Sequence, residues 1–469
     1  MFTMKKIPKI AFLSSLALCA SLAVAQDITP TRVGPVSQYG QLMTGKNSQG
    51  QGRIYGSCEG VKDGAEVQVR GMSLFWSMIT ESTEFWTPEG IATMVRDMNI
   101  QIVRAAMGTT SEDWWGCKNG SNDGSNCEHI TGYATDAEFQ TNLMNTVVQA
   151  AIENDIYVII DWHSHQAHEE VANATKFFTE MAQKWGKYDH VIFELYNEPL
   201  QGTSWSTVKS YAETIVPIIR QYSDNLILVG SRDWDQHPDD AIGNTVSGDN
   251  IAYTFHYYAN SHCWSGQKDA NNQCEGENAQ KAINAGLSVF VSEWGTANAD
   301  GGGDPDQSKN TGWQNWMNTN QLSWANWSAS KKNEGTAAFS SGANRNSLQY
   351  TTSGNMVKGY LATNPTSYTK CAANGGNENG NNGGNENGGN DETPILAKLD
   401  MNYSVTFADK AFHIAGSPAK VEIYTLNGNK LMSVDNVSGT LSLASLPAGK
   451  YFAKIYAHSG STIRAFQIK

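Results

Sequence analysis

Eight short apolar runs alternate along this chain with stretches of helical periodicity, and this alternation restricts the folds that it can adopt. The helical stretches include residues 88–98, 137–154, 172–186 and 203–222. Strands that alternate with helices pair in parallel, and eight such units over about 300 residues predict a (β/α)8 barrel, with a doubly wound open sheet as the alternative. The expected strands lie at residues 67–76, 100–107, 156–161, 191–197, 225–230, 251–258, 287–294 and 321–327.

The composition changes abruptly at one place, the stretch AANGGNENGNNGGNENGGNDETP. A segment rich in Asn, Gly and Glu without large apolar residues cannot bury a core and acts as a flexible tether. We therefore expect a barrel domain at residues 29–373, a linker at 374–393 and a small β-rich module at 394–469. Asn427-Gly428 is the expected hairpin turn of that module.

Residues 1–25 have the pattern of a secretory signal peptide. Lys5, Lys6 and Lys9 precede an apolar run that ends in AVA at residues 23–25. We expect cleavage after this site and a protein that a bacterium secretes or holds on its cell surface. No later apolar run reaches about 18 residues, so no transmembrane anchor is expected.

The balance of charge excludes several classes of partner. The sequence has 33 basic and 46 acidic residues and a formal net charge of −13. Because it contains no basic block, neither nucleic acid nor an anionic membrane is an expected partner. It also has no phosphate-binding glycine motif and no cysteine cluster with metal-ligand spacing, so we expect no cofactor and no metal. Ordinary side chains must carry the chemistry, in a chain that we expect to be monomeric.

Six cysteines follow the predicted signal peptide. An even number in an exported chain favours disulfides over free thiols, although sequence alone leaves the connectivity open. Two pairs each bracket a short polar loop, which favours local bridges and leaves the two outermost cysteines to join the ends of the barrel domain. The expected pairs are Cys117 with Cys127, Cys263 with Cys274, and Cys58 with Cys371.

Polar and aromatic residues gather at the C-terminal ends of the expected strands, which is where a barrel of this kind carries its active site. Any one of them can be explained as a satisfied polar residue at a strand end, but a whole rim cannot. The rim consists of Arg104, Asp161, Trp162, His163, Asn197, Glu198, Trp234, His256, Tyr258, Glu293, Trp294 and Trp327.

Two glutamates of this rim, Glu198 and Glu293, follow strands on opposite sides of the barrel and are expected to face each other. Two carboxyl groups about 5–5.5 Å apart suit a retaining glycosidase, with one as acid/base and the other as nucleophile, whereas a wider gap suits inversion. The charge of one carboxylate helps the other keep its proton. Arg104 and Tyr258 are placed to keep the nucleophile ionised, and Asn197 to donate to the sugar 2-hydroxyl.

The motif VIFELYNEPL resembles the acid/base signature of glycoside hydrolase family 5, the cellulase A family of retaining (β/α)8 enzymes. RGMSLFWS, VRAAM, VIIDWHSH, HYY, SEWG and SWANWS follow the family's order and spacing over residues 60–365. The resemblance implies that Glu198 is the acid/base and Glu293 the nucleophile. The other recurring positions that it implies are Arg104, His163, Asn197, His256, Tyr258 and Trp327.

Within that family the sequence is most similar to bacterial endoglucanases that act on β-1,4-glucan, either cellulose or related soluble glucans. Lys332 stands five residues after Trp327, as in those enzymes, and Trp76 and Trp234 look like platforms for glucosyl rings. The resemblance implies a retaining endo-β-1,4-glucanase. Mannan or xyloglucan as the substrate, or a catalytically inactive glucan-binding scaffold protein, are the alternatives. The loop at 108–133 is longer than usual and would narrow the cleft or add an outer subsite.

The C-terminal module contains no tryptophan, which disfavours a module that binds crystalline cellulose. Its LPAGKYF turn and its last residue, Lys469, resemble the C-terminal sorting domain of type IX secretion substrates. This resemblance implies that the type IX secretion machinery is a partner. A carbohydrate-binding module and an inert stabilising module are the alternatives.

Overall fold

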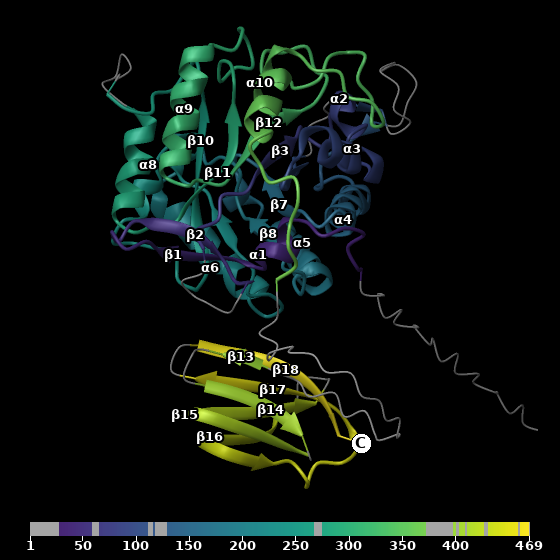
Figure 1. Cartoon of the computed structure of the whole chain (residues 1–469), viewed down its shortest axis with the longest axis vertical. Coiled ribbons are helices and arrows are strands. Elements are labelled where there is room, and N and C mark those ends of the chain that lie inside the picture. Colours follow the sequence, from purple (N-terminus) through teal and green to yellow (C-terminus); the bar gives the residue numbers. More distant parts are fainter. Residues whose placement is uncertain are drawn as a thin grey trace, which may run out of the picture.

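The computed structural model contains a barrel unit and a smaller β-rich unit (Figure 1). The described residues are 28–58, 65–110, 116–117, 129–266, 274–371, 397–399, 403–408, 410–425, 430–457 and 460–468. The predicted signal peptide, the linker, the Asn427-Gly428 turn and Lys469 lie outside them.

Eight parallel strands close into a barrel, which confirms the predicted fold and excludes the open sheet. Each barrel strand pairs with the next one along the chain, and the last pairs with the first. Every expected apolar run overlaps one of these strands, because a parallel strand buried on both faces reads as a continuous apolar run. The strands are β3 (Arg70–Leu74), β4 (Ile102–Gly108), β7 (Tyr157–His163), β8 (Val191–Glu194), β9 (Ile227–Val229), β10 (Ile251–Tyr258), β11 (Val289–Gly295) and β12 (Trp324–Ala329).

Helices surround the barrel and bury their apolar faces against it (Figure 1). Several of them begin at a side chain that accepts a hydrogen bond from a backbone N–H of the first turn, which satisfies a donor that the helix itself leaves unpaired. These caps are Thr87, Asp136, Ser204, Asp306 and Thr351. The helices are α2 (Thr80–Thr83), α3 (Pro88–Met98), α4 (Ala137–Glu153), α5 (Val171–Trp185), α6 (Trp205–Ile219), α7 (Arg232–Asp235), α8 (Glu275–Asn284), α9 (Gln307–Thr319) and α10 (Thr352–Leu361), with 3-10 turns at Ala167–Glu169 and Pro238–Ala241.

The N-terminal end of the barrel is closed by α1 (Pro35–Tyr39) and a hairpin of β1 (Leu42–Lys46) with β2 (Gly52–Gly56). An apolar cluster joins these elements to residues of the barrel strands. Gly52 lies so close to the backbone of Leu287 that a Cβ there would be 1.9 Å from its carbonyl oxygen, so the hairpin fits only with glycine at this position. Because this end is filled, a substrate can approach the barrel axis only from the opposite end.

Two of the three predicted disulfides are present. Cys58 bonds to Cys371, 313 positions further along the sequence, and joins the two ends of the barrel unit. Cys263 bonds to Cys274 across the loop that follows β10. Cys127 lies outside the described residues, so its pairing with Cys117 stays a prediction. Most of the long loop at 108–133 is likewise not described, apart from the short pair β5 (Gly116–Cys117) and β6 (His129–Ile130).

The C-terminal unit is an antiparallel sheet, which confirms the predicted all-β module. Its apolar side chains, among them Phe412, Val421, Ile423 and Phe466, form a core of their own. In the LPAGKYF motif the hydroxyl of Tyr451 donates to the carbonyl oxygen of Pro447 and closes the turn. The strands are β13 (Ala397–Leu399), β14 (Tyr403–Ala408), β15 (Ala411–Thr425), β16 (Lys430–Ser442), β17 (Gly449–Ala457) and β18 (Gly460–Ile468).

In the described part of the chain, none of the helices combines the length and the apolar composition needed to span a bilayer.

Candidate active site

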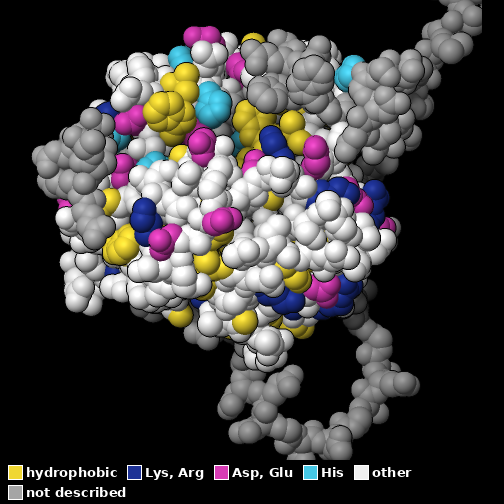
Figure 2. Space-filling view, turned by 90° about the horizontal axis from the view of Figure 1, so that it is seen from above, with side chains coloured by type: hydrophobic (Ala, Val, Ile, Leu, Met, Phe, Trp, Pro, Cys, Tyr) yellow, Lys and Arg dark blue, Asp and Glu magenta, His cyan; other side chains and the backbone are white. Residues whose placement is uncertain are grey.

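Most of the predicted rim residues come together at the C-terminal end of the barrel, whereas Trp162 and Trp294 are fully buried in the hydrophobic core and take no part in the site. Figure 2 shows hydrophobic, histidine and acidic side chains side by side on the face seen from above. Two placements differ from the expectation that these residues end their strands. Arg104 lies within β4 rather than at its end, and Asn197 and Glu198 lie beyond β8, which ends at Glu194. Arg104 is therefore buried beneath the mouth of the barrel, and Glu198 stands above it.

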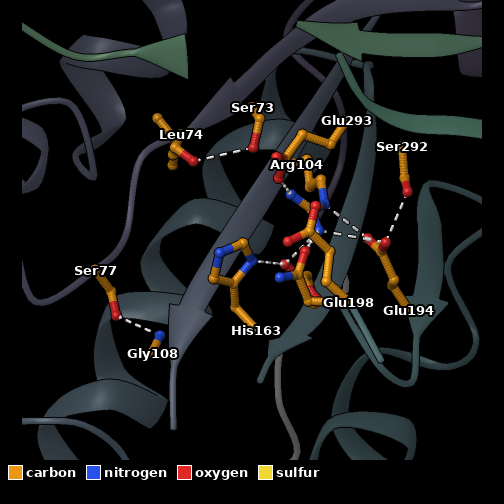
Figure 3. Close-up of polar contacts among 12 residues, drawn as sticks. Ser73, Leu74, Ser77, Arg104, Gly108, His163, Glu194, Glu198, Ser292 and Glu293 are labelled. Carbon is orange, nitrogen blue, oxygen red and sulfur yellow. Dashed lines mark hydrogen bonds and ion pairs between the residues drawn. The ribbon is translucent and has the colours of Figure 1, made fainter. Parts of the chain in front are cut away.

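Arg104 is fully buried and holds the carboxyl groups of the site in place. Its Nη1 donates to Glu293 Oε2 at 2.7 Å and its Nε donates to Glu194 Oε2 at 2.7 Å (Figure 3). Its Nη2 donates to Asn197 Oδ1 at 2.6 Å and lies 3.0 Å from Asp161 Oδ2. Burial opposes its charge, but Asp161, Glu194 and Glu293 raise the pKa of Arg104 well above its usual value. The guanidinium is a permanent cation at the centre of the site.

Glu293, on β11, is fixed by two short hydrogen bonds. Besides the bond from Arg104, its Oε1 accepts a hydrogen bond from the hydroxyl of Tyr258 at 2.7 Å. Burial and the charge of Glu198 raise the pKa of Glu293, and His256, Arg104 and Tyr258 oppose that rise. The carboxylate is thus held in one orientation by donors on both oxygens.

Glu198 lies close to Glu293 and is bound to His256. One oxygen of Glu198, one of Glu293 and one nitrogen of His256 all lie within 4.8 Å of one another. Nδ1 of His256 is 3.0 Å from Glu198 Oε1. Burial favours a proton on Glu198, but the hydrogen bond and the charge of His256 lower the pKa of Glu198. This direction is opposite to the expectation that the neighbouring carboxylate would raise it.

The hydrogen bonds around His256 explain this reversal. The Ser292 hydroxyl donates to Glu194 Oε1 at 2.7 Å, and Nε2 of His256 lies 2.9 Å from the same hydroxyl oxygen. Because that hydroxyl has already used its proton, Nε2 must be the donor in this contact. The remaining nitrogen, Nδ1, faces Glu198, so a single proton lies between the two groups whichever one carries it. Burial lowers the pKa of His256, but Asp235 and hydrogen bonds to Glu194 and Glu198 raise it well above its usual value.

One wall of the site is aromatic. His163 stacks on Trp327 with 5.4 Å between ring centroids, and Trp76 contacts His163 edge to face at 4.6 Å. Burial and Arg104 lower the pKa of His163 well below its usual value. The neutral ring donates from Nδ1 to Asp161 Oδ2 at 2.7 Å, which fixes its tautomer and leaves Nε2 as the acceptor.

Lys332 and Trp234 lie at the edges of the site. The Nζ of Lys332 sits 4.9 Å from the ring centroid of Phe75, which itself packs on Trp327. Trp234 is 39% exposed and lies between Asp233 and Asp235, and all three residues have φ near +60°. Residues other than glycine in this region cost about 1–3 kcal/mol each, and such strain clusters at functional sites. The backbone thus stores strain to present one exposed indole.

Sequence reasoning missed three members of this network: Glu194, Ser292 and Asp235. Glu194 has a readable signal, since an acidic residue interrupts the apolar run VIFELYN and must find a buried partner. Ser292 and Asp235 have none. Ser292 is one of many serines, and Asp235 reaches His256 Nε2 at 3.4 Å only because its strained loop folds back over β10.

Comparison with known proteins identifies the class to which this barrel and site belong. Residues 61–333 match the family Cellulase (glycosyl hydrolase family 5). This match covers more than half of the chain, so the protein belongs to glycoside hydrolase family 5.

Individual relatives agree with this assignment. Endoglucanase Z of Dickeya dadantii is 40% identical over 298 residues, a match that spans 63% of this chain and 62% of that protein. The solved structure of cellulase Cel5C_n is 30% identical, has a TM-score of 0.61, and is matched over 98% of its length and 74% of this chain. The catalytic domain of the Thermobifida fusca endoglucanase Cel5A, solved as a variant with cellotetraose, is 27% identical with a TM-score of 0.58 and is matched over its full length and 71% of this chain.

Replacing Arg104 tests its central role through stability. We predict that Arg104→Met lowers the free energy of unfolding at pH 8 by about 3–5 kcal/mol, because it leaves buried carboxylates without their cation. Without Arg104, burial and mutual repulsion raise the carboxyl pKa values above those of the unfolded chain. The folded variant then binds more protons than the unfolded chain, so its stability falls as the pH rises from 5 to 8. Urea denaturation at both pH values measures this.

Arg104→Lys is the matched control for this prediction. It keeps the charge but cannot reach Glu194, Asn197 and Glu293 together. The free energy of unfolding should therefore fall by less than in Arg104→Met, and the decrease should depend less on pH. If Arg104→Met lowers the free energy of unfolding by the same amount at pH 5 and pH 8, relative to the unmodified protein, then packing and not charge explains the effect.

Proposed function

We propose that this protein is a secreted, retaining endo-β-1,4-glucanase, with Glu198 as acid/base and Glu293 as nucleophile. The observation that carries the proposal is the proximity of the two carboxyl groups, with oxygens within 4.8 Å. An inverting enzyme needs about 6.5–9.5 Å between its carboxyl groups to admit a water molecule, whereas a retaining one needs about 5–5.5 Å. The hydrogen bonds of each carboxyl group then suggest its role.

In the first step the Glu293 carboxylate attacks the anomeric carbon of the glucan. The bond from that carbon to the glycosidic oxygen breaks, and the leaving oxygen takes the proton held between Glu198 and His256. A covalent glycosyl-enzyme ester forms on Glu293. Arg104 and Tyr258 support this role for Glu293, because each donates to one of its oxygens and keeps the lone pairs aimed in one direction.

In the second step Glu198 acts as a base. It accepts a proton from a water molecule, whose oxygen attacks the anomeric carbon from the face that the leaving group vacated. The ester bond to Glu293 breaks, and the product keeps the β configuration. Formation of the ester removes the negative charge from Glu293, and His256 continues to hold Glu198 in place. The same residue can therefore give and take the proton in turn.

Asn197 is proposed to bind the sugar 2-hydroxyl. Its Oδ1 accepts from Arg104, which fixes the orientation of the amide. Within the described chain, Nδ2 has no hydrogen-bond partner and is left to donate to substrate. Such a contact strengthens in the oxocarbenium-like transition state.

Glucan is the proposed substrate because the relatives are endoglucanases and cellulases, and because the solved Cel5A variant carries cellotetraose. Trp76, Trp234 and Trp327 offer indoles on which the C–H faces of glucosyl rings pack, with Lys332 at the edge of the site. Reducing-sugar release from carboxymethylcellulose, mannan and xyloglucan tests this choice. Turnover of mannan or xyloglucan alone would reject glucan.

We further propose that the protein is exported and that the C-terminal unit acts as a type IX sorting domain. The signal-peptide pattern at residues 1–25 and the LPAGKYF turn support this reading. The unit has a hydrophobic core of its own, and the linker at 374–393 contains no apolar residue that would join it to the barrel.

Glu293 is tested by covalent labelling. A mechanism-based fluoroglycoside should form an ester with Glu293, and Glu293→Gln should abolish turnover with glucan binding largely kept, since the covalent step needs a carboxylate. Peptide mass mapping locates the label. A label on another residue would remove this assignment.

Glu198→Ala should reduce kcat on natural glucan by about 10²–10⁴-fold, because the leaving group then departs without a proton. Aryl glycosides with good leaving groups should lose much less. Added azide should restore part of the activity and yield a β-glycosyl azide, as retention requires. Equal losses on all substrates, together with no effect of azide, would show that Glu198 is not the acid/base.

Truncation tests the C-terminal unit. We predict that a chain ending after Ala373 keeps its activity on soluble glucan within about twofold, because a tether without apolar residues transmits little packing. The truncated chain keeps Cys371 and hence its bond to Cys58. In the native host, its export to the surface or medium should fail. Normal export with lost retention on insoluble cellulose would instead identify a binding module.

A further inference from the structure

A second groove lies on the flank of the barrel, away from the catalytic carboxylates. It runs between α8 and α9, which Figure 1 shows side by side, and reaches the β1–β2 hairpin. These two helices pack less closely than α5 and α6 do. The resulting cavity has a volume of about 560 Å³, which falls in the range of about 300–1,000 Å³ typical of small-molecule sites.

The lining of this flank groove selects for a neutral ligand with hydroxyl groups and an apolar face. It contains two indoles, Trp264 and Trp316, and a set of carboxamides that includes Gln51, Gln280 and Asn315. Among the described residues that line it, none is a carboxylate and one is a cation, Arg53. The Arg53 guanidinium is buried, forms an ion pair with Glu66 and also donates to Gly52 and Gln51, so its charge is largely offset before any ligand binds.

Three carboxamides of the groove, those of Gln51, Gln280 and Asn320, are held in fixed orientations. Gln280 Oε1 accepts hydrogen bonds from the indole nitrogen of Trp316 and from the Asn320 amide, both at 3.0 Å. Gln280 Nε2 donates to Asn284 Oδ1, which also accepts from Gln51 Nε2 at 2.9 Å. A chain of amides thus connects α9 to the hairpin, and pre-organised groups of this kind lose little entropy on binding.

Trp264 is fixed at the other end of the groove. The disulfide next to it, Cys263–Cys274, holds its loop, and its ring lies against Gly312 of α9, where a Cβ would be 2.3 Å from the indole. Within the described chain its indole nitrogen has no hydrogen-bond partner. Among the described residues, Trp313 contacts the Trp264 ring edge to face, and Trp313 and Phe255 contact the Trp316 ring in the same way. No aromatic ring among the described residues therefore stacks flat on either indole.

We propose that the flank groove binds a short segment of glucan outside the catalytic cleft. Indoles that pack on the C–H faces of sugar rings, beside amides that bond to hydroxyls, are the chemistry that recognises a neutral saccharide. The lining residues of α9 extend from Gly312 to Thr319, a rise of about 10 Å along the helix, which suits more than one ring in a row. The choice of glucan over other neutral glycans rests on the proposed function. A second site on the same chain raises the local concentration of polymer at the cleft.

The test counts oligosaccharides bound per chain. Isothermal titration of the full-length Glu293→Gln protein with cellohexaose should give about two sites, one in the cleft and one in the groove. Adding Asn315→Arg, which fills the groove from an exposed position of α9, should remove one site. Asn318→Arg is the matched control, because Asn318 is exposed on the same helix but does not line the groove. Trp316→Ala is a second groove variant, with its fold checked by near-ultraviolet circular dichroism.

Each outcome decides the question. Loss of one site with Asn315→Arg and not with Asn318→Arg supports the proposal. If the Glu293→Gln protein binds one cellohexaose and the same protein with Asn315→Arg binds none, the groove site is confirmed and the proposed function of the cleft fails. An unchanged number of sites in both groove variants overturns the proposal. A groove site for mannohexaose but not for cellohexaose overturns the choice of glucan.

Discussion

The buried guanidinium of Arg104 is the interaction on which the rest of the site depends. It sits within β4 with no access to solvent and binds side chains that follow or lie on three other strands. Its five N–H groups spread in a rigid plane, so a single residue sets the positions of Glu194, Asn197 and Glu293 together. The barrel makes this possible because parallel strands bring residues from distant parts of the chain to one end of a common axis.

The carboxyl groups of the site outnumber its cations, and this imbalance has a chemical consequence. Asp161, Glu194, Glu198, Asp235 and Glu293 face Arg104 and His256. Full ionisation of such a buried set is unfavourable, so the cluster retains a proton. Burial raises the pKa of Asp161 and Asp235 well above the usual value, so these carboxyl groups hold protons of their own. The hydrogen bonds of Ser292 place one further proton in the contact between His256 and Glu198. An acid that must release and recover a proton at neutral pH is well served by a neighbour that shares it.

Sugar recognition in this protein is proposed to use two surfaces with different physical designs. In the cleft, a loop with positive φ at Asp233, Trp234 and Asp235 exposes the Trp234 indole, although this backbone conformation is unfavourable for residues other than glycine. On the flank, unstrained helices and a disulfide hold Trp264 and Trp316 beside a fixed chain of amides. Strain is found beside the reacting centre, where a precise geometry matters most.

The sequence by itself determined the barrel, because apolar runs and helical periodicity are local patterns that can be recognised without reference to tertiary contacts. It also pointed to Glu198 and Glu293, since strand order places their ends at one mouth. It placed Arg104 and Tyr258 beside Glu293 as well. Only the tertiary structure revealed the buried network of Glu194, Asp235 and Ser292 around His256. The lowered pKa of Glu198 depends on His256, some sixty residues away and itself set by Asp235 and Ser292. The flank groove depends on the spacing of two helices. Both are products of packing between distant segments, which no local pattern records.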